Sequence, residues 1–308
     1  MTEFDSLLTE MRNPATEEID RLPTLEMLQA IHEGDRTVAD AVRAELPAIA
    51  RAVDGIAACF ERGGRLFYQG AGTSGRLGVL DASECPPTFN VDPQMVQGII
   101  AGGERALRHS VERAEDDPRQ GAEDLKARGL GSNDVVVGIA ASGRTPYVLG
   151  GLEYARSQGA LTVGLSCAPG SDVERLAAIA ITPAVGPEAI CGSTRLRAGT
   201  ATKMVLNMLS TGAMIRMGMV YGNLMVNVQP SNAKLKDRAA RIIAVATGAD
   251  RGEAAELLEQ AGSVRVAILM RKLGMPREEA EARLKAAQGR LRAALGEAAG
   301  DAGESGGR

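Results

Sequence analysis

The chain has 308 residues, long enough to bury a sizeable core in one large domain with a smaller piece beside it. Four tyrosines, four phenylalanines and no tryptophan leave few rings on which bases could stack. The net charge is −4 with both signs interspersed, so the clustered basic face of a nucleic-acid-binding protein is missing. Composition therefore argues against a nucleic-acid partner and favours a small-molecule substrate.

The cysteines and histidines bear on compartment and metal binding. The cysteines are scattered singly at Cys59, Cys85, Cys167 and Cys191. Such usage predicts reduced thiols and a cytoplasmic protein. The acidic start MTEFDSLLTE has no secretory signal, and no apolar run approaches the roughly 18 residues of a membrane helix, so we expect no membrane association. The two histidines lack companion ligands at regular spacing, so we expect no metal.

The N-terminal part predicts an arm followed by a parallel sheet. Residues 1–34 form the predicted arm, in which Glu17 to Ile31 has helical periodicity. One long amphipathic helix is predicted from Asp35 to Arg62. Short apolar runs then alternate with helical patterns, which is typical of parallel strands with crossover helices. The five predicted strands are Arg65–Gln69, Met95–Ala101, Asp134–Ala140, Leu161–Ser166 and about Ala178–Thr182.

The C-terminal third is predicted to be helical. The apolar segment from Ala198 to Met217 suits a buried helix or a subunit interface. From about Asp237, helices separated by Gly and Pro predict a three- or four-helix domain, with helices at 238–247, 252–261, 263–273 and 276–295. We therefore assign residues 35–236 to the α/β domain, 237–297 to the small helical domain and 298–308 to a disordered tail.

Two strand-to-helix turns carry most of the functional signal. The first, GAGTSGRLGVLDASECPP at 70–87, contains the G-x-G-x-x-G spacing of a dinucleotide loop. A dinucleotide site also needs a full helix and an acid at the end of the second strand. Here two prolines follow after about three helical turns, and the second strand ends in Ala-Gly-Gly. Thr73 and Ser74, at a helix N-terminus beside Gly72, instead suit a single phosphate.

The second turn, SGRTP at 142–146, follows the third predicted strand and also places hydroxyls and a proline at a helix start. Ser142 and Thr145 supply its hydroxyls. Because parallel strands bind ligands at their carboxyl edge, both turns could hold one phosphate. The alternative is that these hydroxyls only cap helices. Both turns carry a similar set of hydroxyl side chains, and this similarity favours phosphate binding over capping.

Four stretches of the sequence resemble the N-acetylmuramic acid 6-phosphate etherases, which carry one sugar isomerase (SIS) domain. These stretches are GAGTSGRLGVLDASECPP at 70–87, GIAASGRTPY at 138–147, GSTRLRAGTATK at 192–203 and RNPATEEIDRLPTLEM at 12–27. The likeness runs from about Leu8 to Leu295, and the DASECPP segment is its most specific part. It implies an SIS-type three-layer α/β/α sandwich with a five-stranded parallel sheet, plus a small C-terminal ubiquitin-associated-like helical domain. It also implies that Thr73, Ser74, Ser142 and Thr145 contact the phosphate.

The resemblance further implies the reaction. Etherases of this family release D-lactate from C3 of N-acetylmuramic acid 6-phosphate in cell-wall recycling, without a cofactor. The open-chain aldehyde acidifies the C2 proton, elimination expels D-lactate, and water then adds back at C3. One carboxylate must remove the C2 proton and one carboxylic acid must protonate the departing oxygen. By match to the family we expect Glu84 to be the acid, aimed by the prolines after a short helix, and Glu115 to be the base.

Other residues compete for these roles. Glu112 is expected on the same helical face as Glu115, and His109 titrates near neutrality, although the family match does not support it. Arg113 stands where the family usually has a glycine, beside the expected base. Three basic residues could reach the sugar or its lactyl carboxylate, or could equally be ordinary surface residues. They are Arg195, Lys203 and Lys234.

Three functions remain open from the sequence. The leading one is an etherase acting on a sugar phosphate as a homodimer, with the apolar 198–217 helix as its expected interface. The second is a non-catalytic sugar-phosphate sensor resembling the glucokinase regulatory proteins, which usually carry two SIS domains where only one is visible here. The third is an aldose–ketose isomerase, which would not explain the acid in DASECPP.

Overall fold

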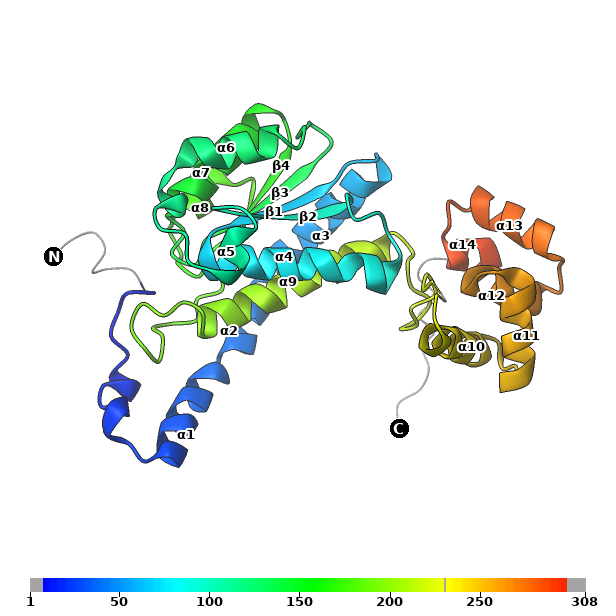
Figure 1. Ribbon diagram of the computed structural model, residues 1–308, viewed down its shortest axis with the longest axis horizontal. Coiled ribbons are helices and arrows are strands. Elements are labelled where there is room, and N and C mark those ends of the chain that lie inside the picture. Colours follow the sequence, from blue (N-terminus) through cyan, green and yellow to red (C-terminus); the bar gives the residue numbers. More distant parts are fainter. Residues whose placement is uncertain (1–7, 230, 298–308) are drawn as a thin grey trace. The chain divides into compact units, whose positions relative to one another are not determined.

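The computed structural model describes residues 8–229 and 231–297, which divide into two compact units (Figure 1). The first unit comprises the residues up to 84 together with 92–213. The second comprises 85–91 and the residues from 214 onward. The predicted disordered tail at 298–308 and the first seven residues of the predicted arm lie outside the described residues. The predicted boundary at 236/237 falls inside a helix and stays a prediction.

The first unit is built on a five-stranded parallel sheet in the order β2-β1-β3-β4-β5. Its strands are β1 (Leu66–Gly70), β2 (Val96–Ile100), β3 (Val135–Ile139), β4 (Leu161–Leu165) and β5 (Ile179–Ile181). The five strands and the α/β class are as predicted. The residues of β1 and β3 are all buried, as expected for continuous apolar runs covered on both faces.

The strand order places a topological switch point between β1 and β3. From β1 the chain crosses to β2 on one side of the sheet, and β3 then pairs with β1 on the other side. Gly70 and Ile139 are in register at the carboxyl ends of these two strands. In open parallel sheets, ligands bind in the crevice beside such a switch point. The turns that follow β1 and β3 are therefore neighbours at the ligand-binding edge.

Helices cover both faces of this sheet (Figure 1). One face carries α6 (Pro118–Lys126), α7 (Pro146–Ser157) and α8 (Asp172–Leu176), and the other carries α3 (Leu46–Glu61), α4 (Gly72–Phe89) and α9 (Arg197–Arg216). The remaining helical segments of this unit are η2 (Pro14–Thr16), η3 (Ile19–Arg21), α1 (Thr24–Asp35), α2 (Val38–Ala44), α5 (Arg105–Arg108) and η4 (Ala114–Asp116). No helix among the described residues has the length and apolar character to cross a membrane.

The predicted helices near the N-terminus are shorter than expected. The helix predicted from Asp35 to Arg62 is divided, because Pro47 lies in the first turn of α3 and has no N–H to continue the preceding helix α2. The helix predicted from Glu17 starts only at Thr24, after Pro23. Both corrections have the same physical cause, since proline is tolerated in a first turn but interrupts a helix interior.

Helix α4 is longer than predicted. It continues through Pro86 and Pro87 to Phe89, so Glu84 lies within the helix and not after it. The prolines fall in the last turn, where few hydrogen bonds are lost, and the buried Cys85 and Phe89 hold this turn in the second unit. The side-chain amide of Asn227 also donates to the carbonyl of Phe89. Packing therefore outweighs the cost of the two prolines.

Helix α9 covers most of the apolar segment that was expected to be buried or to form a subunit interface. Val205, Leu206, Leu209 and Ala213 are at most 1% exposed within the single chain. The predicted helix is therefore confirmed as a buried helix of the first unit. Its most apolar face is covered within the single chain, and its predicted role in a subunit interface stays a prediction.

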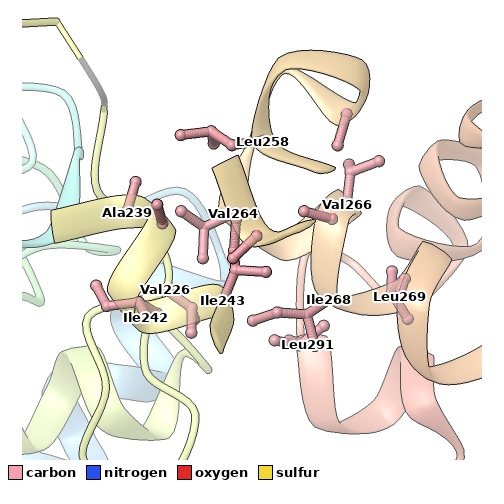
Figure 2. Packing of buried hydrophobic residues seen from close by; sticks show 14 of the residues in the cluster. Val226, Ala239, Ile242, Ile243, Leu258, Val264, Val266, Ile268, Leu269 and Leu291 are labelled. Atoms are coloured by element: carbon pink, nitrogen blue, oxygen red, sulfur yellow. The ribbon is translucent and has the colours of Figure 1, made fainter. Parts of the chain in front are cut away.

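The second unit is a small helical domain with its own core (Figure 2). Its helices are α10 (Ala233–Thr247), α11 (Arg251–Ala261), α12 (Val264–Leu273), α13 (Arg277–Ala286) and α14 (Leu291–Leu295). The helix predicted over 276–295 is divided because Gln288 and Gly289 have left-handed backbones, with φ of 54° and 77°. The core includes Val226 as well as side chains of all five helices, so it begins upstream of Asp237.

Capping explains where three of these helices begin and end. Asn232, Asp250 and Ser263 each accept a backbone N–H in the first turn of the helix that follows. The same helices end at Gly248, Gly262 and Gly274, all in the left-handed conformation. The Gly-separated pattern in the sequence was therefore a sound guide to these boundaries.

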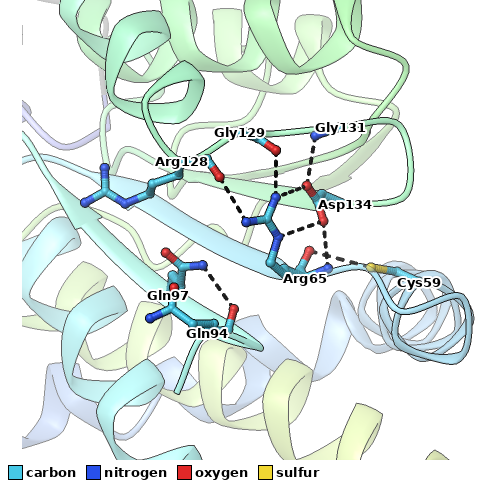
Figure 3. A network of polar contacts seen from close by, with 8 residues as sticks. All are labelled: Cys59, Arg65, Gln94, Gln97, Arg128, Gly129, Gly131 and Asp134. Atoms are coloured by element: carbon cyan, nitrogen blue, oxygen red, sulfur yellow. Dashed lines mark hydrogen bonds and ion pairs between the residues drawn. The ribbon is translucent and has the colours of Figure 1, made fainter. Parts of the chain in front are cut away.

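A partly buried ion pair joins the starts of β1 and β3 (Figure 3). The Arg65 guanidinium donates to the Asp134 carboxylate at 2.8 Å and 3.3 Å, and the Arg65 backbone N–H donates to it at 2.8 Å. The same guanidinium donates to the carbonyls of Arg128 and Gly129. Gly131 contributes another backbone N–H to Asp134 at 2.9 Å. This network fixes the two strands that flank the switch point.

The Asp134 carboxyl is only 6% exposed, and burial by itself raises its pKa. Hydrogen bonds from Arg65 and from the backbone of Gly131 outweigh burial and hold the pKa below its ordinary value of 3.8. The ionised form therefore stabilises the fold. Because the folded pKa lies below the unfolded one, this stabilisation is present above pH 3.8 and is lost as the pH falls through the folded pKa.

Asp134→Asn is expected to lower the free energy of unfolding by about 2 kcal/mol near pH 7, because it removes charge-assisted hydrogen bonds to a buried group. Urea unfolding followed by circular dichroism measures the change. The difference between variant and wild type should shrink below pH 4, where the wild-type carboxyl takes up a proton. Glu123→Gln, which removes an exposed pair with Lys126, is the control and should change stability by less than about 0.5 kcal/mol. An equal effect of the two substitutions would contradict this role of Asp134.

Candidate functional site

The turn between β1 and α4 allows a very close approach of helix to strand. A Cβ atom on Gly75 would lie 2.6 Å from the carbonyl oxygen of Gly70, so only glycine fits there. The helix begins at Gly72, whose φ is +52°. The first N–H groups of a helix have no intrahelical acceptor and carry its positive dipole end. They stand directly above the carboxyl end of β1.

The Thr73 and Ser74 hydroxyls lie in this first turn. Both residues are half-buried. Neither hydroxyl forms a hydrogen bond to the part of the chain that the structure describes. They are therefore available to a ligand, together with the N–H groups of the turn.

The turn between β3 and α7 is held by the segment that follows β4. Gly143 has a φ of +68°, and a Cβ atom there would lie 2.2 Å from the side chain of Ser171. The Ser142 hydroxyl accepts weakly from the N–H of Arg144, at 3.4 Å. Thr145 is the N-cap residue of α7, yet its side chain makes no capping hydrogen bond. By contrast, Ser171 does cap its own helix α8. Capping therefore does not account for the Thr145 hydroxyl.

The β1–α4 and β3–α7 turns are neighbours because β1 and β3 are neighbouring strands. The hydroxyl-bearing residues of both turns follow the carboxyl ends of their strands, at the edge where α4 begins with its first N–H groups unpaired within the helix. Such a combination is suited to one compact anion with several acceptor oxygens. No acid ends β2, which runs into Ala101 and two glycines, so a dinucleotide ribose would lack its usual partner.

The start of α9 lies against the first turn of α4. A Cβ atom on Gly199 would be 3.7 Å from the Thr73 methyl group. The GSTRLRAGTATK segment, one of the stretches that carry the resemblance, therefore contacts the β1–α4 turn. Arg195 and Lys203, within this segment, are exposed. Lys234 belongs to the second unit, so it is not brought to this edge by the fold of the first unit.

Glu188 is a buried residue that sequence reasoning missed. It is 1% exposed, and its carboxylate accepts from the backbone N–H groups of Arg197 at 2.9 Å and Ala198 at 3.0 Å. It therefore caps α9 from nine residues upstream and fixes the end of the helix that touches Thr73. Local capping patterns do not detect so distant a cap. The available signal was an acidic residue inside the otherwise uncharged stretch 183–194.

Glu115 borders a cavity beside the first turn of α4. The cavity has a volume of about 510 Å³, and Ala71, Gly72, Arg76 and His109 are among its other lining residues. The fold thus places the expected base and the start of the β1–α4 turn at the same cavity. His109 and Glu112 line the same cavity and remain competitors for Glu115.

The segment that carries Glu115 is not the regular helix expected from the sequence. Glu115 lies in the short η4, and Arg113 before it has a left-handed backbone with φ of 62°. Glu112 therefore precedes a sharp change in direction and does not share a helical face with Glu115. A non-glycine residue in this conformation costs about 1 kcal/mol, which gives a physical reason for a glycine at this position.

Arg76 is a second residue that sequence reasoning missed. Its guanidinium donates to the carbonyls of Ala106 at 2.7 Å and Leu107 at 3.1 Å. It thereby fastens α5, just before the segment with Glu115, to the second turn of α4. The cation inside the glycine-rich motif was the available signal, but its partners are carbonyls that no sequence pattern specifies.

Glu84 lies far from this cavity within one chain. It is exposed, and ten residues of α4 separate it from Ser74, a rise of about 15 Å. Helix α4 runs from the carboxyl edge of the sheet back toward the amino edge. Within one chain the cavity is therefore lined by Glu115 and by the start of the β1–α4 turn at Ala71 and Gly72, but not by Glu84.

The cysteines behave as packing residues. Cys59, Cys85 and Cys167 are buried, Cys191 is exposed, and none of these four described cysteines forms a disulfide. Burial raises the pKa of Cys59 to about 11 and that of Cys167 to about 12, so neither is a thiolate near neutral pH. Within 8–229 and 231–297, no three His, Cys, Asp or Glu side chains gather closely enough to hold a metal ion.

Comparison with known proteins finds two matching protein families and several similar full-length relatives. Residues 48–156 match the "Glucokinase regulatory protein N-terminal SIS domain" and residues 120–212 match the "SIS domain". An N-acetylmuramic acid 6-phosphate etherase of Rhizobium rhizogenes is 57% identical over 288 residues, covering 93% of this chain and 94% of that protein. The protein of the same name from Cronobacter sakazakii is 58% identical, covering 91% and 95%. N-acetylmuramic acid 6-phosphate etherase 2 of Vibrio parahaemolyticus is 56% identical, covering 92% and 95%.

Ser74→Ala and Thr145→Val are each expected to weaken the binding of inorganic phosphate about tenfold, since each removes one hydrogen bond to an anion. Phosphate titration followed by ³¹P nuclear magnetic resonance measures the dissociation constant. Ser157→Ala is the control, because that hydroxyl is exposed and donates to its own helix. Unchanged phosphate binding in both Ser74→Ala and Thr145→Val would show that the anion binds elsewhere.

Proposed function

Because this chain belongs to the N-acetylmuramic acid 6-phosphate etherase family, we propose that it cleaves the D-lactyl ether of N-acetylmuramic acid 6-phosphate. The products are N-acetylglucosamine 6-phosphate and D-lactate, and the reaction serves the recycling of cell-wall sugar. The observation that carries this proposal is that the turns after β1 and β3 are neighbours at the switch point, and that the first turn, through Ala71 and Gly72, borders the cavity lined by Glu115.

The phosphate anchors the substrate. Its oxygens accept from the first N–H groups of α4 and from the hydroxyls of Thr73, Ser74, Ser142 and Thr145. Both turns are rigid, because Gly75 packs against Gly70 and side chains pack closely against Gly143. A rigid anchor at C6 fixes the distance from the phosphate to C2 and C3, where bonds must change.

The bond changes follow from two carboxyl groups. Glu115 takes the C2 proton of the open-chain sugar, and the electron pair moves toward the C1 carbonyl as an enolate forms. Collapse of the enolate breaks the bond between C3 and the ether oxygen, while Glu84 donates a proton to that oxygen and D-lactate leaves. Water then adds at C3, one proton returns to C2, and the two carboxyl groups regain their starting states.

A sugar-phosphate sensor is the second candidate, because residues 48–156 match the N-terminal SIS domain of glucokinase regulatory protein. A sensor needs the phosphate turns but not the carboxylates. Release of D-lactate from N-acetylmuramic acid 6-phosphate by the purified protein separates the two candidates. A sensor would bind the sugar and release none.

The protein is also proposed to be a cytoplasmic homodimer. Four cysteines without a disulfide, three of them buried, suit a reducing compartment. A dimer is supported by the distance between Glu84 and the cavity, since two carboxyl groups must flank one ether. The dimer surface is a different one from the buried face of α9.

Turnover in D₂O enriched in ¹⁸O is expected to give N-acetylglucosamine 6-phosphate with deuterium at C2 and ¹⁸O at C3. The ether oxygen should leave with D-lactate, which therefore gains no ¹⁸O at its hydroxyl group. Mass spectrometry of both products measures the labels. Label at the lactate hydroxyl, or a product without either label at C2 and C3, would rule out elimination followed by hydration. Product incubated with Glu115→Gln protein controls for exchange after the reaction.

A further inference from the structure

Arg113 lies beside the expected base in a strained backbone conformation. Its φ of 62° is left-handed, and Asn90 and Gln288 are the other described non-glycine residues with a positive φ. Of these three, Arg113 lines the cavity that contains Glu115. Strain of this kind persists only where the surrounding structure holds it, and it is concentrated at functional sites. The arginine side chain is therefore a candidate for a functional role.

The backbone of Arg113 has a structural task that glycine could perform with less strain. Its carbonyl accepts from the N–H of Asp116 at 3.2 Å and so begins the short helix η4. The segment before it is held by packing, because a Cβ atom on Gly102 would lie 3.0 Å from Cβ of Val111. Glycine adopts the left-handed conformation without a steric penalty. What glycine cannot supply is the guanidinium group.

The Arg113 guanidinium has no partner within the described part of the chain. The side chain is exposed, and it forms no hydrogen bond or ion pair with a described residue. Acidic side chains line the adjoining cavity of about 590 Å³, which Arg113 also borders, yet none of them pairs with it. Its donors are therefore available to a ligand.

The other two groups in the Glu115 cavity that can carry a positive charge are Arg76 and His109. The Arg76 guanidinium already donates to the carbonyls of Ala106 and Leu107. His109 carries its two nitrogens on different sides of the ring, so it cannot donate to both oxygens of one carboxylate. An arginine with available donors binds both oxygens in a fixed fork. Arg113 is thus the group in this cavity best suited to a carboxylate.

The proposed substrate brings a second carboxylate close to Glu115. The D-lactyl group is joined to C3 through the ether oxygen, and a single carbon separates that oxygen from the lactyl carboxylate. C3 is bonded to C2, from which Glu115 takes a proton, so the two carboxylates approach each other and repel. A cation beside the base offsets this repulsion. Arg195 and Lys203 do not line the cavity, whereas Arg113 does.

We propose that Arg113 is a specificity-determining residue that binds the lactyl carboxylate of the substrate in the cavity beside Glu115. This inference rests on the proposed function, because the lactyl group belongs to the proposed substrate. The guanidinium donates a pair of charge-assisted hydrogen bonds to the carboxylate and holds the C3 substituent beside the base. The protein therefore distinguishes a sugar with an ionised lactyl group from one whose lactyl group is amidated.

Two substrates that differ in one charge test the proposal. One is N-acetylmuramic acid 6-phosphate, and the other is its lactyl amide, in which a neutral carboxamide of similar size replaces the carboxylate. Both give N-acetylglucosamine 6-phosphate, which mass spectrometry measures. The wild-type kcat/KM is expected to be about 10- to 100-fold higher for the acid, because the amide loses the charge-assisted hydrogen bonds. Competition against the acid gives the affinity for the amide where its turnover is too slow to measure.

Arg113→Gln and Arg113→Gly remove the charge in two different ways. Glutamine keeps the strained backbone, whereas glycine relieves the strain. In both variants kcat/KM for the acid should fall about 10- to 100-fold, and the value for the amide should change less than about threefold. Arg113→Lys keeps a cation and should retain part of the preference. The urea midpoint should not fall in Arg113→Gly, which separates lost specificity from lost stability.

Arg62→Gln is the matched control. Arg62 is exposed and follows α3 just before β1 begins, at the amino edge of the sheet, so its loss should change neither rate. An equal loss for acid and amide in Arg113→Gln and Arg113→Gly would overturn the proposal, because Arg113 would then only shape the segment with Glu115. An unchanged preference in both variants, or a wild type that converts acid and amide equally well, would overturn it too. A wild type that converts neither sugar would instead refute the proposed function.

Discussion

The proposed contact between a phosphate and the first turn of α4 determines where every other group of the site can act. A helix N-terminus is attractive to anions because its N–H groups lack acceptors and its dipole is positive there. In this fold the attraction is focused at a switch point, where a second hydroxyl-bearing turn stands beside the first. Two buried carboxylates support the arrangement from a distance: Asp134 ties the starts of β1 and β3, and Glu188 fixes the start of α9.

The same helix fixes how far Glu84 lies from the turn that we propose binds the phosphate. Because α4 is a rigid helix, its first turn and Glu84 lie at a fixed distance from each other. Rotation of side chains cannot close this distance. Glu115 is carried by a different kind of element, a short turn with a left-handed residue beside it and an arginine clamp before it. Glu84 therefore lies on a rigid helix, and Glu115 lies on a short turn.

Much of the first unit could be predicted from the sequence because its strands are continuous apolar runs and its turns have distinctive chemistry. The buried residues of β1 and β3 leave no alternative to a covered sheet, and Thr73, Ser74 and Thr145 stood out as hydroxyls at helix starts. The position of Glu84 could not be predicted, because two consecutive prolines predict the end of a helix, whereas packing continues this helix to Phe89. The cap supplied by Glu188 was equally inaccessible, since it depends on a tertiary contact nine residues away from its helix.

The most direct measurement is a crystal structure of the protein with N-acetylglucosamine 6-phosphate bound. Phosphate oxygens are expected within about 2.5–3.0 Å of the hydroxyls of Thr73, Ser74 and Thr145, with the sugar ring extending toward Glu115. A phosphoryl group bound away from these two turns would contradict the central claim, because the carbons of the ether would then lie beyond the reach of the cavity.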